Sequence, residues 1–249
     1  MTQGRQRSAD PASQMMIDHA CQADIPIAWD RLESQEPQCG FGRLGICCRN
    51  CTMGPCRIDP FGQGAQAGVC GATADTIVAR NLLRALLGGA AAHSDHGRDI
   101  VHALALAAEG KSDVYKIKGP AKLRKLAEEY EIAVDGRSDE EIAKELAHFL
   151  LGELGKQEGV LANVVRVPEQ QQKFWAAEGV TPRGVDRDIV TGMHMTHIGV
   201  DNDPEHLIMG SVRAALADGW GGSMIATDVS DVLFGEPEPT RSLANLGVL

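Results

Sequence analysis

The crowding of cysteines near the start of the chain constrains its fold more than any other feature. Six of the seven cysteines lie within 32 consecutive residues, and only Cys21 lies outside that segment. The six are Cys39, Cys47, Cys48, Cys51, Cys56 and Cys70. Residues 39–71 also contain eight glycines and the pairs Gly54-Pro55 and Asp59-Pro60, which exclude long regular elements. We therefore expect a loop-rich module organised by bound metal, because concentrated thiols in a reducing compartment hold metal more often than disulfides.

The composition of the whole chain excludes several classes of protein. The 249 residues are 43% hydrophobic and 23% charged, which is typical of a chain with one large or two small cores. A formal net charge of −10 has the wrong sign for binding nucleic-acid phosphates, and an aromatic content of 4% disfavours base stacking. We find neither the run of about 18 apolar residues that a membrane helix needs nor the apolar core of a secretory signal. We expect a cytoplasmic protein that binds no nucleic acid.

Beyond the cysteines, apolar residues recur three and four positions apart, which predicts an all-α domain. The expected helices run from about Ala72 to Gly88-Gly89, from about Ala90 to Ala108 before Gly110, from Lys122 to Tyr130, from Asp139 to Leu151, from Thr181-Pro182 onward, and from Pro204 to Ala217 before Gly219. Ser138 with Glu141 predicts a capping box, and Asp203 predicts an N-cap followed by proline. Residues 160–167 fit either a strand or a loop that leads into another helix.

Cys48, Cys51, Cys56 and Cys70 form the pattern C-x2-C-x4-C-x13-C. Four thiolates suit either a [4Fe-4S] cluster or a structural zinc ion. The surrounding glycines favour the cluster, because its sulfides need close backbone approach and N–H donors, whereas zinc ribbons more often pair two C-x2-C motifs. The spacing thus favours iron and sulfur, with zinc and then disulfides as alternatives.

The charge around these cysteines points the same way. From Cys39 to Arg57 the acidic chain carries three arginines, Arg43, Arg49 and Arg57, and no acid. Cations at this place offset the negative charge of a four-thiolate cluster. Three solvated arginines in a surface loop are the alternative.

Cys47 and Cys48 are neighbours, and neighbouring side chains diverge in extended or turn backbone. We therefore assign them to different centres. Cys39 and Cys47 then remain as a C-x7-C pair, which is half of the ligand set of a [4Fe-4S] cluster. A twofold axis would supply the other half from a second copy of the chain. Free thiols or a disulfide are the alternatives for this pair.

Several motifs closely resemble the amino-terminal region of the anaerobic nickel-iron carbon monoxide dehydrogenases. They are Cys39-Gly40-Phe41-Gly42, the run from Cys47 to Ile58, Gly68-Val69-Cys70-Gly71, Asp218-Gly219-Trp220-Gly221-Gly222, and the run from Thr227 to Gly235. The resemblance implies an all-helical first domain and a relay [4Fe-4S] cluster on Cys48, Cys51, Cys56 and Cys70. It also implies a second cluster, shared through Cys39 and Cys47 across a homodimer, that passes electrons to a ferredoxin-like acceptor.

His93, His96 and His102 lie at multiples of three along an expected helix, so they wind around it instead of lining one face. That geometry is poor for one metal ion but suits a relay of imidazoles. By themselves, however, three such histidines are more often surface or satisfied core groups than a relay. The resemblance implies proton transfer in this stretch, with His93 close to the catalytic cluster, while Asp99 stands where the family often has another histidine. His194, His197 and His206 are interpreted as structural.

The resemblance also implies a nickel-iron-sulfur centre, held by one histidine and several cysteines in carboxyl-terminal Rossmann-like domains. This chain has no cysteine after Cys70, and family members are more than twice as long, so we expect that centre only in the full-length family. The expected segments are a flexible segment at 1–30, the iron-sulfur module at 31–71, the helical domain at 72–220 and the beginning of a truncated Rossmann-like α/β domain at 221–249. The apolar end Asn245–Leu249 suggests that missing domains or a second polypeptide complete the protein.

The main hypothesis is that the chain is the amino-terminal part of an enzyme that converts CO + H2O to CO2, two protons and two electrons. This chain carries the electron relay, and we expect it to be inactive by itself. A standalone electron-transfer or dimerisation module without CO chemistry is the alternative from a different class. A hybrid-cluster (hydroxylamine reductase) relative is a third reading, although that family places its cysteines almost at the amino terminus and lacks the Cys47-Cys48 doublet. A structural zinc module is the fourth.

Overall fold

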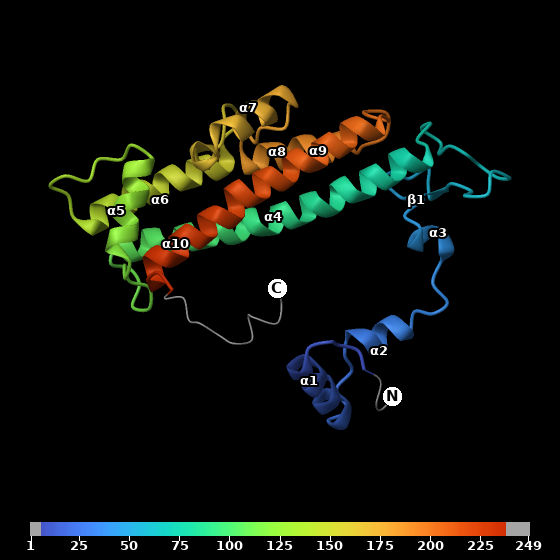
Figure 1. Ribbon diagram of the computed structural model, residues 1–249, viewed down its shortest axis with the longest axis horizontal. Helices are drawn as coiled ribbons and strands as arrows, with labels where there is room; N and C mark the ends of the chain where they lie inside the picture. Colours follow the sequence, from blue (N-terminus) through green and yellow to red (C-terminus); the bar gives the residue numbers. More distant parts are fainter. Residues whose placement is uncertain (1–5, 238–249) are drawn as a thin grey trace. The chain divides into compact units, whose positions relative to one another are not determined.

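The computed structural model describes residues 6–237 and is mostly helical (Figure 1). The chain divides into two compact units, the first ending at Cys47 and the second beginning at Cys48. None of the helices in the described residues combines the length and apolar character that a membrane crossing requires.

The first unit contains three helices that bury none of their own residues: α1 (Pro11–Gln22), α2 (Ala28–Glu33) and α3 (Gly40–Arg43). The Asp10 side chain caps α1 by accepting a hydrogen bond from the Ser13 N–H. Arg7 pairs with Glu33 at 2.6 Å and lies 5.9 Å from the centre of the Trp29 ring. Residues 11–22 are thus helical, although they lie within the segment 1–30 that the sequence predicted to be flexible. The helix begins because Asp10 caps it and a proline occupies its first turn, although none of its residues is buried in a core.

In the second unit the long helix α4 (Ala74–Ala108) contacts α6, α8, α9, η2 and α10 (Figure 1). It runs without a break through Gly88 and Gly89, so the prediction of two separate helices is wrong. Each glycine costs only about 1 kcal/mol relative to alanine inside a helix. Leu87 and Ala90 are buried on either side of the pair, and their packing continues the helix. The predicted end is confirmed, because α4 stops at Ala108 and Gly110 has a φ of +67°.

The remaining elements follow in the order α5 (Pro120–Glu129), α6 (Asp139–Gly155), the 3-10 turn η1 (Ala162–Arg166), α7 (Glu169–Ala177), α8 (Val185–Met195), α9 (Pro204–Ala217), the π-helical turn η2 (Asp218–Ser223) and α10 (Met224–Phe234). The predicted capping box of Ser138 with Glu141 and the predicted cap of α9 by Asp203 are confirmed. Of the two alternatives for residues 160–167, the structure shows the turn that leads into a helix, α7, and no strand. The helix expected from Thr181-Pro182 is α8, which begins three residues after Pro182.

The core of the second unit lies on the buried face of α4. One cluster joins α4 to α5, α6 and α10 and includes Leu104, Leu123, Leu146 and Val229. A smaller cluster joins α4 to α9; it consists of Ala79, Leu83, Leu87, Leu207 and Ala214. The amino-terminal end of α4, which Thr73 caps, therefore packs against α9. The cysteine loop leads directly into this end of the helix.

The chain was expected to leave its helix before Gly219, but it continues through η2 into α10. A side-chain carbon on Gly222 would lie 2.8 Å from the His93 carbonyl carbon, and one on Gly97 would lie 3.1 Å from the Gly222 oxygen. Glycines at these positions let η2 cross α4 with the two backbones in contact.

The predicted beginning of a Rossmann-like domain at 221–249 is helical as far as Phe234. The apolar end Asn245–Leu249 lies outside the described residues. The predicted iron-sulfur module at 31–71 contains α3 and two paired strands of two residues each, β1 (Cys47–Cys48) and β2 (Cys56–Arg57).

Candidate metal centre

Four cysteines line one pocket of the second unit. Cys48 is buried, whereas Cys51, Cys56 and Cys70 are half-buried, and none of the four is in a disulfide. The other residues that line the pocket are Asn50, Gly68, Ala72, Ile77, Arg80 and Ile198. The structure thus brings together the four cysteines of the C-x2-C-x4-C-x13-C pattern and places them against the start of α4.

Glycines bring the backbone close to the sulfur atoms of this pocket. A side-chain carbon on Gly68 would lie 3.3 Å from Cys56 Sγ, and one on Gly54 would lie 3.0 Å from the Cys48 carbonyl oxygen. The Val69 N–H donates a hydrogen bond to Cys56 Sγ over 3.4 Å. Close backbone approach with an N–H aimed at sulfur is the environment that an iron-sulfur cluster requires.

The pocket is attached to the helices through Asn202, in the segment between α8 and α9. Its Nδ2 donates to the Cys70 carbonyl oxygen over 2.9 Å, and its Oδ1 accepts from Arg80 Nη2. The Thr76 hydroxyl donates to the Asn202 carbonyl oxygen over 2.7 Å. Nearby, Asn50 Nδ2 donates to the Thr196 carbonyl oxygen over 3.2 Å. These bonds fix a loop that has little apolar core of its own.

Arg80 is the charged group that lines the pocket, and only 1% of its surface is exposed. Its Nη1 donates to Cys70 Sγ over 3.6 Å, and its Nη2 donates to the Asp201 carbonyl oxygen over 2.6 Å. Its Nε is buried and has no hydrogen-bond partner within residues 6–237. Burying a cation costs several kcal/mol unless an opposite charge compensates it.

The contact with Arg80 also changes the acidity of Cys70. Burial raises the pKa of this thiol, but hydrogen bonds from Arg80 and from the Ala72 backbone, together with the Arg80 charge, outweigh burial. The net result is a pKa below the ordinary cysteine value. The shift makes Cys70 easier to deprotonate than an ordinary cysteine, and the thiolate is the form that ligates metals.

The three arginines singled out in the sequence, Arg43, Arg49 and Arg57, are exposed. The cation that faces the four cysteines is instead Arg80, which the sequence analysis missed. A signal for it was present, because Arg80 falls at helical spacing between the apolar residues Ile77 and Leu83. An arginine inside the apolar stripe of a helix is unusual without a buried partner.

No three histidine, cysteine or acidic side chains of residues 6–237 converge closely enough to hold a single metal ion. A structural zinc ion needs four ligands about 2.0–2.3 Å from one point. A [4Fe-4S] cluster instead binds each thiolate through a different iron atom, so its sulfurs stand farther apart. The four-cysteine donor set, the close glycines and the unpartnered Arg80 Nε fit the cluster better than one ion.

Cys39 and Cys47 belong to the first unit. Cys39 immediately precedes α3 and is exposed, whereas Cys47 opens β1 and is half-buried. Because β1 is extended, the side chains of Cys47 and Cys48 point to opposite sides of the strand. This direction agrees with the assignment of the two neighbours to different centres, which stays a prediction.

The structure gives His93 specific partners. Its Nδ1 lies 2.7 Å from Asp218 Oδ1 and 3.2 Å from Ser223 Oγ, so both ends of η2 contact the same ring nitrogen. His96, Asp99 and His102 are exposed on α4. His194, His197 and His206 are exposed too, and His206 lies 3.5 Å from Asp201.

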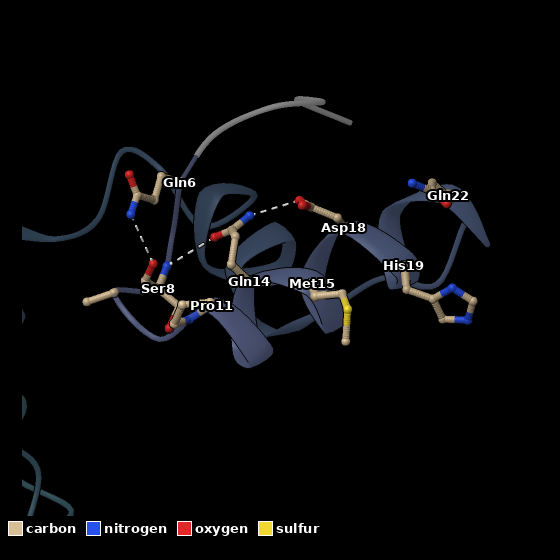
Figure 2. A pocket seen from close by; sticks show the side chains of 9 residues that line it. Gln6, Ser8, Pro11, Gln14, Met15, Asp18, His19 and Gln22 are labelled. Carbon is tan, nitrogen blue, oxygen red and sulfur yellow. Dashed lines mark hydrogen bonds between the residues drawn. The ribbon is translucent and has the colours of Figure 1, made fainter. Parts of the chain in front are cut away.

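A separate hollow of the first unit lies along α1, where residues from Gln6 to Gln22 line it (Figure 2). Gln14 organises it, because its Oε1 accepts from the Arg7 and Ser8 N–H groups and its Nε2 donates to Asp18. The residues that line this hollow include none of the predicted site residues.

The comparison with known families decides what kind of protein carries this site. The profile of the Prismane/CO dehydrogenase family matches residues 46–249. The chain belongs to the Prismane/CO dehydrogenase family. Carbon monoxide dehydrogenase 1 of Methanosarcina mazei is 59% identical over 244 residues, which are 98% of this chain and 39% of that protein. Carbon monoxide dehydrogenase 1 of Carboxydothermus hydrogenoformans is 47% identical and covers 97% of this chain.

Solved structures of carbon monoxide dehydrogenases share the fold of this chain. A nickel-free carbon monoxide dehydrogenase from Thermococcus sp. AM4 matches with a TM-score of 0.87 and 52% identity, over 94% of this chain and 37% of that one. An acetyl-CoA synthase/carbon monoxide dehydrogenase with NiZn[Fe4S4] and NiNi[Fe4S4] clusters in its alpha subunits matches with a TM-score of 0.85 and 40% identity. The chain spans less than two fifths of the length of these relatives.

We predict that Asn202→Ala loosens the four-cysteine loop. The change removes the hydrogen bond to the Cys70 carbonyl and one acceptor of Arg80, so backbone amides of residues 68–72 should exchange with deuterium at least tenfold faster, which corresponds to about 1.4 kcal/mol. The neighbouring Asp203→Ala is the control, because Asp203 caps α9 and does not contact the loop residue Cys70. Equal exchange of residues 68–72 in the two variants would show that Asn202 does not hold the loop.

Proposed function

We propose that this chain is the amino-terminal, cluster-bearing part of an anaerobic carbon monoxide dehydrogenase and that its own share of the reaction is electron transfer. The complete reaction is CO + H2O to CO2, two protons and two electrons. The observation that carries this proposal is the pocket in which Cys48, Cys51, Cys56 and Cys70 face the buried Arg80. Family membership and relatives named carbon monoxide dehydrogenase support it.

In this proposal the four cysteines hold a relay [4Fe-4S] cluster. When bound, such a cluster accepts and releases one electron at a time. The protein holds the four thiolates, aims the Val69 N–H and Arg80 at the sulfur atoms, and shields the site by burying Cys48. The catalytic nickel-iron-sulfur centre is expected in other parts of the complete protein, because this chain has no cysteine after Cys70.

A standalone electron-transfer or dimerisation module is the second candidate, and it rests on the same pocket. CO-dependent reduction of a viologen dye by the complete protein separates the two, because only the dehydrogenase couples CO to electron release. The hybrid-cluster reading loses support, because the curated relatives with 31–59% identity carry the name carbon monoxide dehydrogenase. A cytoplasmic location and a ferredoxin-like acceptor stay predictions.

We predict that Cys51→Ala lowers the iron content of the anaerobically purified protein by about four atoms per chain, because the cluster loses one of its four ligands. Cys21→Ala is the matched control, since Cys21 lies in α1 outside the cysteine-rich segment, and it should leave iron and acid-labile sulfide unchanged. A colourless protein with one zinc per chain would instead support the structural zinc alternative.

We further propose that Cys39 and Cys47 hold half of a second cluster, shared with another copy of this chain across a twofold axis. The divergence of Cys47 and Cys48 along β1 supports this division of the cysteines.

The expected effect of Cys47→Ala is a loss of about two iron atoms per chain, half of the loss from Cys51→Ala, because two chains share the second cluster. Iron analysis and the sedimentation coefficient of the same sample measure cluster and dimer together. Unchanged iron content would remove Cys47 from the ligands, and a loss of about four atoms would place it in the relay site.

We propose that His93 transfers a proton, with His96 and His102 exposed farther along α4 as further members of the relay. A carboxylate only accepts hydrogen bonds, so the 2.7 Å contact with Asp218 places a hydrogen on His93 Nδ1. This contact fixes the ring and leaves Nε2 as the atom that accepts and releases the proton. Asp218 is therefore a positioning residue in this proposal.

We expect His93→Gln to lower the rate of CO-dependent viologen reduction by about 100-fold or more, as is typical for loss of a proton-transferring group, with iron and nickel contents unchanged. Asp218→Asn should give a smaller loss, because the amide still contacts the ring but no longer requires a hydrogen on Nδ1. His206→Gln, in an exposed histidine of α9, is the control. Equal rates for His93→Gln and His206→Gln would refute the role of His93.

A further inference from the structure

Arg80 is a buried cation whose protein partners do not balance its charge. The atoms that accept hydrogen bonds from its guanidinium are the Asp201 carbonyl oxygen, the Asn202 amide oxygen and Cys70 Sγ. None of these partners is a carboxylate, and no carboxylate within residues 6–237 pairs with Arg80. An arginine side chain keeps its charge in proteins, so the burial of Arg80 calls for an anion nearby.

The place for that anion is the four-cysteine pocket. Arg80 lines the pocket, and its buried Nε carries an N–H for which the described protein residues offer no acceptor. The backbone of Asp201 and the side chain of Asn202 hold Nη2, so the guanidinium has a fixed orientation. A [4Fe-4S] cluster with four thiolates is negatively charged, and its sulfurs accept N–H hydrogen bonds.

We propose that Arg80 is a positioning residue of the relay site, whose Nε–H donates to a sulfur of the bound cluster and whose charge raises the reduction potential of that cluster. This inference rests on the proposed function, since it requires a cluster on Cys48, Cys51, Cys56 and Cys70. It adds to the proposed function a residue that shifts the potential at which the relay accepts an electron.

The direction of the effect follows from the charge balance. Reduction adds one electron to the cluster and changes its core from [4Fe-4S]2+ to [4Fe-4S]+, while the ligands stay bound. A nearby cation stabilises the reduced, more negative form more than the oxidised form. The effect is strong at this site because Arg80 is buried and solvent screens it little. Removing the charge must therefore lower the midpoint potential.

The experiment compares Arg80→Gln with Arg98→Gln in the complete, anaerobically purified holoprotein. Arg98 lies on the same helix, pairs with Asp186 at 2.7 Å, and is about 27 Å along the helix axis from Arg80 at 1.5 Å per residue. The two variants remove the same charge from α4, but only Arg80 faces the four cysteines. The readout is a redox titration followed by the EPR signal of the reduced cluster that Cys51→Ala abolishes.

The expected result is that Arg80→Gln shifts the reduction equilibrium at least tenfold toward the oxidised form, a drop of about 59 mV for a one-electron couple, whereas Arg98→Gln leaves it in place. An unshifted midpoint in Arg80→Gln with full iron content would overturn the inference and leave the proposed function intact. A protein without the cluster-derived EPR signal in its native form would overturn the proposed function itself.

A second measurement keeps the inference testable if Arg80→Gln fails to assemble its cluster. In native protein labelled with 15N in the arginine side chains, pulsed EPR of the reduced cluster should detect a coupled 15N nucleus, because Nε–H donates directly to a cluster sulfur. The coupling should persist in Arg98→Gln. No 15N coupling in the native protein would overturn the inference whatever the variant does.

Discussion

The rest of this structure depends on the contact of the buried Arg80 with Cys70, in the pocket that the four thiols line. Residues 48–71 form short strands and turns with little apolar core of their own, so the loop needs attachment to the helices. Arg80 provides it, since it reaches Cys70 with one nitrogen and the segment before α9 with another. The loop, α4 and the segment before α9 are therefore held together at one charged point. The proposed anionic cluster at that point would stabilise the same arrangement that binds it.

The helix that carries Arg80 also carries His93, thirteen residues later and about 20 Å along the axis. One rigid element thus connects a group proposed for electron transfer with a group proposed for proton transfer. The rotation of α4 at His93 is fixed by the backbone contact between Gly97 and Gly222, and the same crossing places Asp218 and Ser223 against the imidazole. Oxidation of CO releases both electrons and protons, so a scaffold that positions both kinds of group suits the proposed reaction.

Local signals in the sequence predicted much of this arrangement. The capping box at Ser138 and the proline start after Asp203 depend on residues within one helical turn, and both are present in the structure. Gly88 and Gly89 led to the wrong prediction of two separate helices, because packing on the buried face of α4 outweighs the weak helix propensity of glycine. The π-helical turn at 218–223 was not predicted, since it depends on close approach to a helix more than a hundred residues earlier. Arg80 was missed for the same reason, because its partners Asp201 and Asn202 are close only in the folded chain.

The most direct test of the central claim is an anomalous-scattering map at the iron absorption edge from crystals of the anaerobically purified protein. The account predicts four iron positions bounded by Cys48, Cys51, Cys56 and Cys70, with the Arg80 guanidinium facing one edge of the cluster. A single peak that appears at the zinc edge and not at the iron edge would contradict it, as would a disulfide between any two of these four cysteines.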